Sequence, residues 1–383
     1  MTAPNPIAVS HGSSELERVT VDAYNAELRD AQGFIGDRAS NRAFRAILDE
    51  SRERIREVAH EDPLGDTPTQ ELPKKKMDKL LMQGEPEAAG VIQGAIEEFA
   101  SELSTVIIRF LKLKAWRDTE RIVVGGGLRA SRVGELAIGR ASVLVKEAGH
   151  NLQIVPVHDH PDEAGLLGAV HLAPGWMLDG HDAILGVDIG GSNLRAGLVE
   201  LRAAKTEKTA KKPNESADDT DKKPGDKAGD KRSPVGRAAV KELELWRYAD
   251  EKARPSREEA IERIGTMLER LIRHAAKNHV KLAPFIGVGC PGIIAADGHI
   301  ERGGQNLPGN WESSRFNLPA RLTELIPKID GNATVVVMHN DAVVHGLGDL
   351  PHVRDVHRWG VLTIGTGLGN ARFTNKFPVP AGK

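Results

Sequence analysis

The sequence predicts a mixed α/β protein of two domains, and three observations support this. Short apolar runs typical of buried strands alternate along the chain with longer helical patterns. The chain has 383 residues, more than a single domain usually holds, and 40% of them are hydrophobic, which is enough to bury a substantial core. Glycine is the one residue in excess, with 40 copies, and it gathers in turns that directly follow predicted strands.

The first part of the chain predicts helices packed around two short strands. In residues 39–58, apolar side chains recur near helical spacing with charged residues between them. Prolines mark residues 60–76 as a loop. The remaining elements expected here are helices at 88–112 and 131–149, strands at 121–127 and 152–158, and a small-residue helix that ends at Pro174.

The second part opens with a strand, a glycine turn and a strand at 183–201. Residues 203–234 follow, in which alanine is the only apolar residue type. Such a segment cannot bury enough surface to offset its ordering entropy, so we expect a disordered insertion. The elements expected after it are a strand at 240–249, a helix at 255–278, strands at 285–292 and 334–341, a helix at 342–350, and a strand–turn–strand unit at 358–376.

Composition excludes several classes of protein. The single cysteine, Cys290, rules out an internal disulfide and a multi-cysteine zinc site, and we expect it to be a small buried residue. Basic and acidic residues number 52 and 54, and this balance disfavours nucleic-acid binding by bulk charge. No apolar run approaches the ~20 residues that span a bilayer. The N-terminal residues lack the pattern of a secretory signal, so we expect a cytoplasmic protein.

Three glycine turns are candidate phosphate-binding sites, because glycine lets backbone N–H groups approach a phosphate without obstruction by a Cβ atom. Asp188, at the end of its strand, could hold Mg²⁺ through water. The alternative is that these are ordinary tight turns, since a single glycine motif is a weak signal. The candidate residues are Gly125, Gly126, Gly127, Asp188, Gly190, Gly191, Ser192, Asn193, Gly365, Thr366, Gly367 and Gly369.

These motifs resemble a known family. DIGGSNLRAG and GTGLG resemble the two phosphate motifs of the actin/hexokinase superfamily. IGVGCPGII, NLPGNW and HNDAVVHGLG resemble the ROK family of bacterial sugar kinases and repressors, and VVGGGLRAS and DEAGLLGAVHLA resemble its C-terminal adenosine region. The resemblance covers about 120–175 and 183–375 without the insertion. It implies two actin-like (ribonuclease H-like) domains around a central cleft, and ATP-dependent phosphorylation of a hexose with ATP and Mg²⁺ as cofactors.

The order of the motifs differs from that of the family. In ROK proteins the aspartate–glycine strand comes first and the GGG segment comes last, whereas here residues 121–173 precede residue 183. A circular permutation would account for this order. We then expect a larger nucleotide-side domain from 1–175 plus 359–383, and a smaller domain, 182–355, with the first phosphate motif and the sugar site. The alternative is an ordinary two-domain protein with coincidental glycines.

The resemblance also implies a sugar site. Asn306 and Asn340 would bind sugar hydroxyls, and Pro291 and Gly292 would shape the pocket floor. Asp341 would be the general base that takes the proton from the attacking hydroxyl, which we expect to be the 6-hydroxyl of a hexose, with glucose as the first candidate. The alternative is that Asn340 or Asp341 caps the following helix.

Metal ligands are scarce in the sequence. Many ROK proteins carry an ExGH motif followed by a cysteine-rich zinc motif, and no such pair of motifs is present here, so we expect no zinc, and the usual glutamate and histidine contacts to the sugar are left unassigned. His158 and His160 flank Asp159, which suggests a metal site, but the spacing supplies no third ligand. A surface or loop position is the simpler interpretation of these histidines.

Two rival functions follow from the same motifs. One is a non-catalytic sugar-binding protein or a ROK-type transcriptional regulator, in which the helix at 39–58 would belong to a helix-turn-helix; the near-neutral charge disfavours it. The other is a phosphatase or ATPase of the same superfamily, which the PG, NLPGNW and ND residues disfavour. We expect a small sugar as the partner and no membrane, and a homodimer is left open.

Overall fold

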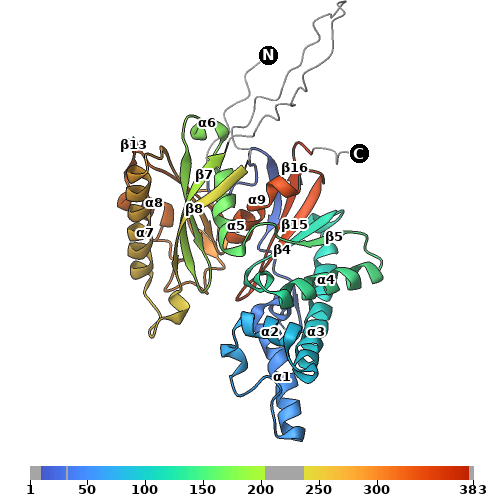
Figure 1. Ribbon diagram of the computed structural model, residues 1–383. Helices are drawn as coiled ribbons and strands as arrows, with labels where there is room; N and C mark the ends of the chain where they lie inside the picture. The colour runs from blue at the N-terminus through green and yellow to red at the C-terminus, as the bar shows by residue number, and fades with distance from the viewer. Residues whose placement is uncertain (1–9, 32, 203–236, 379–383) are drawn as a thin grey trace, which may run out of the picture.

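The computed structural model describes residues 10–31, 33–202 and 237–378, and these form a layered α/β structure (Figure 1). Two five-stranded sheets alternate with three groups of helices. The mixed α/β class predicted from the sequence is therefore confirmed. The segment 203–234, expected to be a disordered insertion, lies outside the described residues.

The first sheet combines strands from both ends of the chain. Its order is β1-β16-β15-β4-β5. β15 runs parallel to β4, and β4 runs parallel to β5, whereas β16 is antiparallel to both of its neighbours. The strands are β1 (Val19–Tyr24), β16 (Leu368–Asn375), β15 (Arg358–Ile364), β4 (Arg121–Gly125) and β5 (Gln153–Pro156).

The second sheet comes from one continuous stretch of the chain. Its order is β14-β9-β6-β7-β8, with β6, β9 and β14 parallel and the hairpin β6-β7-β8 antiparallel. The strands are β14 (Val335–Asn340), β9 (Leu282–Cys290), β6 (Ala183–Ile189), β7 (Leu194–Arg202) and β8 (Arg237–Trp246).

The two sheets share one topology if the first is read from β15. The places of β6, β7, β8, β9 and β14 in the second sheet are taken in the first by β15, β16, β1, β4 and β5, with the same parallel and antiparallel neighbours. In the second sheet the corresponding hairpin, β6-β7, comes first in the chain. In the first sheet the hairpin β15-β16, residues 358–375, comes last, after β1, β4 and β5.

Helices cover the outer face of each sheet. The first sheet with its helices α1 (Asn41–Ala59), α2 (Lys74–Gln83), α3 (Pro86–Leu111) and α4 (Arg132–Glu147) is called the first lobe below. The second sheet with α7 (Arg257–Lys277) and α8 (Leu318–Leu325) is called the second lobe. Shorter elements are β2 (Arg29–Asp30), β3 (Gly33–Phe34), α6 (Gly175–Leu178), β10 (Ile293–Ile294), β11 (Ile300–Arg302), β12 (Lys328–Ile329) and β13 (Asn332–Ala333).

Two helices, α5 (Pro161–Ala169) and α9 (Asp341–Gly348), form the central layer between the sheets (Figure 1). Alternation along each strand produces this layering, because successive side chains point to opposite faces. In β15, Trp359 and Val361 join the central core, while Leu362 and Ile364 pack under the helices of the first lobe. In β6, Ile184 faces the central core and its neighbour Leu185 faces the second lobe's own helices.

Several elements were not predicted from the sequence, namely β1, α2, α6, α8 and the two-stranded pairs of short strands. β1 lies in the N-terminal residues to which no element was assigned, and α2 begins within the segment that was interpreted as a loop. α2 begins directly after Pro73 and buries little besides Met77, so its apolar pattern is weak. Within the described residues, none of the helices combines the length and apolarity needed to cross a membrane.

Glycines allow α5 and α9 to pack in close contact. A Cβ atom at Gly168 would lie 1.7 Å from the carbonyl oxygen of Val344, and one at Gly348 would lie 2.4 Å from that of Ala164. Both distances are far below van der Waals contact. The absence of these side chains therefore sets the spacing of the central layer, and with it the spacing of the two sheets.

We predict that Gly168→Ala destabilises the protein by at least about 3 kcal/mol, the upper end of the range for an overpacked core. The matched control is Gly139→Ala in α4, where an added Cβ has no neighbour within 4 Å. Because alanine favours a helix, that control should gain about 0.5–1 kcal/mol. Urea unfolding of both variants measures the difference. Equal stabilities would contradict the packing role assigned to Gly168.

Candidate active site

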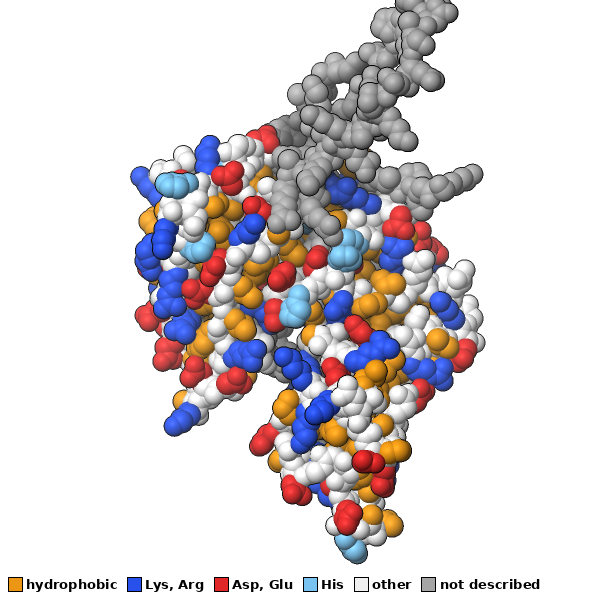
Figure 2. Space-filling model, in the orientation of Figure 1, with side chains coloured by type: hydrophobic (Ala, Val, Ile, Leu, Met, Phe, Trp, Pro, Cys, Tyr) orange, Lys and Arg blue, Asp and Glu red, His pale blue; other side chains and the backbone are white. Residues whose placement is uncertain are grey.

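A cavity of about 820 Å³ opens between the two lobes. Its volume lies within the range of roughly 300–1,000 Å³ that is usual for ligand sites. Figure 2 shows a notch that opens downward between the left part and the lower part of the molecule, with Lys and Arg side chains along its border. The cavity is lined by most of the residues singled out in the sequence: Gly126, Gly127, Asp188, Gly190, Gly191, Ser192, Asn193, Pro291, Gly292, Asn306, Asp341, Gly365, Thr366, Gly367 and Gly369. Gly125 and Asn340 are not among its lining residues.

The three glycine turns meet at one edge of the sheets. They follow the carboxyl ends of β4, β6 and β15, the edge at which α/β folds usually bind ligands. The hydroxyl oxygens of Ser192 and Thr366 lie 2.9 Å apart and join the turns of the two lobes. Gly126 has a φ of +87°, and a Cβ there would lie 2.4 Å from the carbonyl oxygen of Ile364, so only glycine fits this contact.

The first residues of α1 and α2 support these turns and bring positive charge to them. The backbone N–H of Asn41 donates to the carbonyl of Gly365 at 3.0 Å, and Arg42 Nε donates to that of Thr366 at 3.2 Å. Lys74 Nζ donates to the carbonyl of Gly127 at 2.5 Å. Arg42 and Lys74 also line the cavity. Two cations beside glycine turns make this part of the cavity suitable for an anionic group.

Asp188 lies at the centre of a charged network and is 1% exposed. Its Oδ2 accepts a hydrogen bond from Arg195 Nη1 at 3.0 Å, and its Oδ1 lies 3.2 Å from His345 Nε2. Arg195 also pairs with Asp162 of α5 at 2.6 Å. Burial opposes ionisation of Asp188, but His345 and Arg195 outweigh it and lower the pKa of this carboxyl to about 2. Asp188 is thus a permanent anion at neutral pH.

Asp341, the first residue of α9, behaves differently. Burial, together with the negative charge of Asp188, raises the pKa of the Asp341 carboxyl to about 6, although His345 acts in the opposite direction. Burial also acts against protonation of His345, but the charge and hydrogen bond of Asp188 raise the pKa of this imidazole. One cavity therefore holds one carboxylate fixed as an anion and another that titrates close to neutrality, which is the pKa range suited to a general base.

The donor set at Asp188 fits a hydrated magnesium ion rather than a directly bound one. Both carboxylate oxygens already accept hydrogen bonds from side chains, so a directly bound metal would lie close to the positive charges of Arg195 and His345. Each carboxylate oxygen nevertheless has a further lone pair for a water molecule. Mg²⁺ retains several of its waters in most protein sites, so the predicted contact through water is compatible with this geometry.

Asn340 lies at the start of α9 and its side chain has a structural role. Its side chain is 2% exposed and is the N-cap of α9, with its Oδ1 accepting from the backbone N–H groups of Ala342 and Val343. Its Nδ2 donates to the carbonyl of Gly292 at 2.9 Å. The capping alternative therefore holds for Asn340, whose amide also binds the turn at Gly292, and its assignment as a sugar ligand stays a prediction. Asn306 is exposed and lines the cavity, as a sugar-binding residue requires.

The sequence analysis did not single out Arg195 and His345, although local sequence patterns could have placed both at the site. Arg195 is the cross-strand partner of Asp188 around the GGSN turn, so its position follows from the hairpin. His345 comes four residues after Asp341, which places it on the same face of a helix. Lys74 had no such signal, because α2 was not predicted and Lys74 reaches Gly127 only through the fold.

Comparisons with known proteins give partial matches. No family model matches the sequence, and no curated protein matches it. Part of the chain is similar to the solved structure of ROK hexokinase from Thermus thermophilus, with 16% identity, a TM-score of 0.28, and coverage of 49% of this chain and 45% of that one.

Two further solved structures match to a similar extent. One is from Cytophaga hutchinsonii and assigned as a sugar kinase (16% identity, TM-score 0.32, 52% of this chain and 50% of that one). The other is from Listeria monocytogenes and assigned as an N-acetylmannosamine kinase (18%, 0.29, 52% and 50%). The matched region spans about half the length of each of these structures. At such TM-scores the matches carry no functional argument, and the function proposed below is drawn from this chain's own residues.

We predict that His345→Gln raises the pKa of the Asp341 carboxyl above its wild-type value of about 6. The charge of His345 stabilises the ionised form of Asp341, and the neutral glutamine removes it. A ¹³C NMR titration of labelled aspartate carboxyls measures the shift, with His274→Gln on the exposed surface of α7 as the control. An unchanged or lowered pKa in His345→Gln would show that His345 does not act on Asp341.

Proposed function

We propose that this chain is an ATP-dependent sugar kinase of the ROK type in circularly permuted form. The observation that carries the proposal is the position of Asp341, which borders the same cavity as the glycine turns and has a pKa of about 6. A kinase needs a base beside the acceptor hydroxyl and a phosphate cradle within reach of it. The motif resemblance supplies the substrate class, a hexose, with the 6-hydroxyl as acceptor and glucose as the first candidate.

The residues that line the cavity would bind the nucleotide, the metal ion or the sugar according to their position. The N–H groups of the turns at 126–127, 190–193 and 365–369, with Lys74 and Arg42 beside them, would hold the triphosphate of ATP. Mg²⁺, when bound through water near Asp188, would neutralise charge that develops on the phosphates. Asn306, Pro291 and Gly292 would hold the sugar on the side of the second lobe.

Asp341 would accept the proton of the attacking sugar hydroxyl. Above a pH of about 6 its carboxylate is ionised and can take this proton. Burial raises the pKa of Asp341, His345 on the next turn of α9 acts against this, and the charge of Asp188 adds a smaller increase. The residues that line the cavity come from both lobes, so movement of the lobes toward each other would exclude water, which otherwise competes as phosphate acceptor.

A permuted ROK arrangement is supported by the shared topology of the two sheets. The strand that carries GTGLG and the strand that carries GGG are parallel neighbours in the first sheet, although the second lobe separates them in the chain. The proposed domains are 1–175 with 359–383 on the nucleotide side, and 182–355 on the sugar side.

The rival interpretation as a transcriptional regulator has less support. The helix at 39–58, which would belong to its helix-turn-helix, corresponds to α1, and α1 buries Phe44 and Leu48 against the core of the first lobe. The N-terminal end of α1 is also used at the glycine turn, where Asn41 bonds to Gly365. A helix held on both sides in this way is part of the nucleotide-side lobe.

We predict that Asp341→Asn lowers kcat for ATP-dependent sugar phosphorylation by ~10²–10⁴-fold, the usual range for loss of a general base. Sugar binding should weaken far less, because the amide still offers hydrogen bonds. In the wild type, kcat/KM should fall as the pH decreases through about 6, because protonated Asp341 cannot accept a proton. Steady-state kinetics and sugar-binding calorimetry measure both quantities.

The matched control is Asp37→Asn, which removes an exposed carboxylate that lines the same cavity. This variant should keep near wild-type turnover and the same pH profile. Circular dichroism of both variants checks that they are folded. Wild-type turnover in a folded Asp341→Asn variant would eliminate Asp341 as the base.

A further inference from the structure

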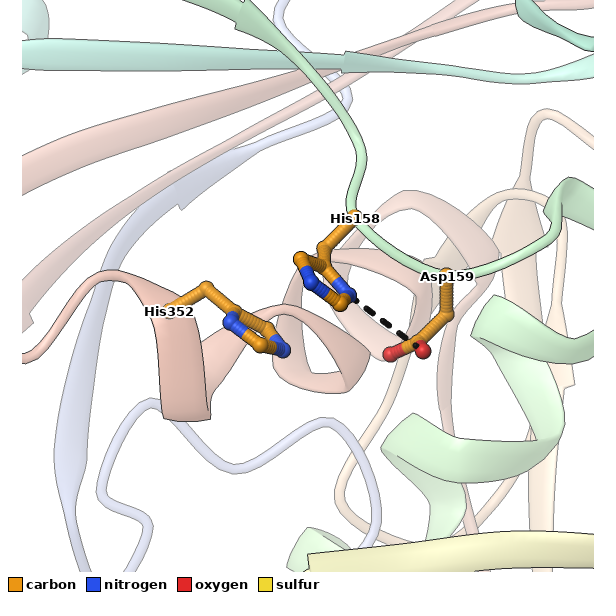
Figure 3. Close-up of side chains that lie close together, drawn as sticks. All are labelled: His158, Asp159 and His352. Atoms are coloured by element: carbon orange, nitrogen blue, oxygen red, sulfur yellow. Dashed lines mark ion pairs between the residues drawn. The ribbon is translucent and has the colours of Figure 1, made fainter.

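Three potential metal ligands from two segments that are far apart in the sequence meet outside the cavity. His158 and Asp159 lie in the segment between β5 and α5, and His352 lies in the 3₁₀ helix η7 (Leu350–His352) that follows α9. Figure 3 shows the two imidazoles side by side with the carboxylate of Asp159 next to them. One ligand atom from each residue lies within 4.8 Å of those of the other two. His352 is the third ligand that the sequence spacing did not supply.

The backbone holds both parts of this cluster in place. The backbone N–H of His158 donates to Oδ1 of Asp349 at 2.9 Å, and the backbone N–H of His352 donates to the carbonyl of the same residue at 2.8 Å. Asp349 is 2% exposed. Arg121 Nη1 donates to the carbonyl of His352 at 3.1 Å while its guanidinium pairs with Asp355 at 2.7 Å. The backbones of the two ligand-bearing segments are therefore fixed to each other and to β4.

We propose that His158, Asp159 and His352 form a binding site for a divalent transition metal of the Zn²⁺ class. Two imidazoles and one carboxylate are a donor set that Zn²⁺ uses when it has three protein ligands and one open position. The hard ions Mg²⁺ and Ca²⁺ prefer oxygen ligands and do not suit such a site. This site is separate from the ROK-type zinc motif, which the sequence lacks, and it is independent of the proposed kinase function.

The side chains have a spacing that suits a shared ion but not yet the orientation. The imidazole centroids lie 3.6 Å apart with the ring planes 9° from parallel. Two nitrogens that share a tetrahedral Zn²⁺ at about 2.0–2.1 Å would be similarly close, but their lone pairs must converge on the ion. The side chains must therefore rotate, and their exposure of 50% for His158 and 32% for Asp159 leaves room for rotation.

The position of the cluster gives the site a structural consequence. The segment at 157–160 leads from the first sheet into α5, and η7 leads from α9 toward β15 of the first sheet. α5 and α9 are the helices that separate the two sheets. A metal ion at this cluster would link the two connections to each other, and would therefore stabilise the folded central layer.

The test is Zn²⁺ binding by the full-length, chelator-treated protein, measured by competition with a chromophoric chelator and by the shift in melting temperature. We expect one site per chain and a higher melting temperature with Zn²⁺, with no such effect of Mg²⁺ at the same concentration. His352→Ala and His158→Ala should each weaken Zn²⁺ binding by about 100-fold or more and abolish the thermal shift. Co²⁺ in place of Zn²⁺ should give the visible absorption of a site with nitrogen ligands in the wild type only.

The matched control is His160→Ala. His160 is an exposed histidine two residues from His158, and its ring caps α5 by accepting from the N–H of Asp162. This variant should bind Zn²⁺ like the wild type. The proposal is overturned if the wild type shows no saturable site, or if folded His352→Ala binds Zn²⁺ as the wild type does. Loss of binding in His160→Ala with retention in His352→Ala would equally overturn it.

Discussion

The close contact of α5 and α9 between the two sheets is the constraint on which the rest of the structure depends. Where Gly165 of α5 faces β6, an added Cβ would lie 2.7 Å from Cγ of Asp188 and 2.9 Å from Nε2 of His345. The space that a side chain would occupy is taken by the charged groups of the cavity. The glycines of α5 therefore have two effects: Gly168 allows α5 to pack closely on α9, and Gly165 leaves room for Asp188 and His345 at the cavity.

Burial of these charges then determines their protonation. Asp188 is deep enough that it would resist ionisation alone, and the two partners that reverse this come from different elements, Arg195 from β7 and His345 from α9. Asp341 lacks such a pair and titrates near neutrality instead. One cavity thus contains two carboxyl groups whose pKa values are shifted in opposite directions, as sites for proton transfer commonly require.

Much of the fold was predictable because its signals are local. Strands such as 183–189 and 358–364 are short apolar runs bounded by glycine turns, and α7 carries a capping box at Ser256 and Glu259 ahead of an amphipathic pattern. β1 and α2 were missed because neither has a strong pattern of its own; β1 becomes a strand by pairing with β16 at the other end of the chain. The glycine turns were found for the same local reason.

The contacts between distant residues could not be read from the sequence. Lys74 reaches Gly127, Asp162 reaches Arg195, and His352 stacks on His158 only after the chain has folded. Asn340 was assigned to the sugar together with Asp341, and the structure shows in addition that its amide caps α9. Residues in one motif can thus have separate roles, and only the fold distinguishes them.

The central claim is that one cavity between the lobes transfers phosphate from ATP to a sugar hydroxyl. The most direct test incubates the wild-type protein with ATP, Mg²⁺ and each member of a panel of hexoses and N-acetylhexosamines, and quantifies ADP together with sugar phosphate by ³¹P NMR. The account predicts that at least one sugar gives ADP and sugar phosphate in equal amounts. Release of ADP and inorganic phosphate without sugar phosphate, or no turnover with any sugar, would contradict it.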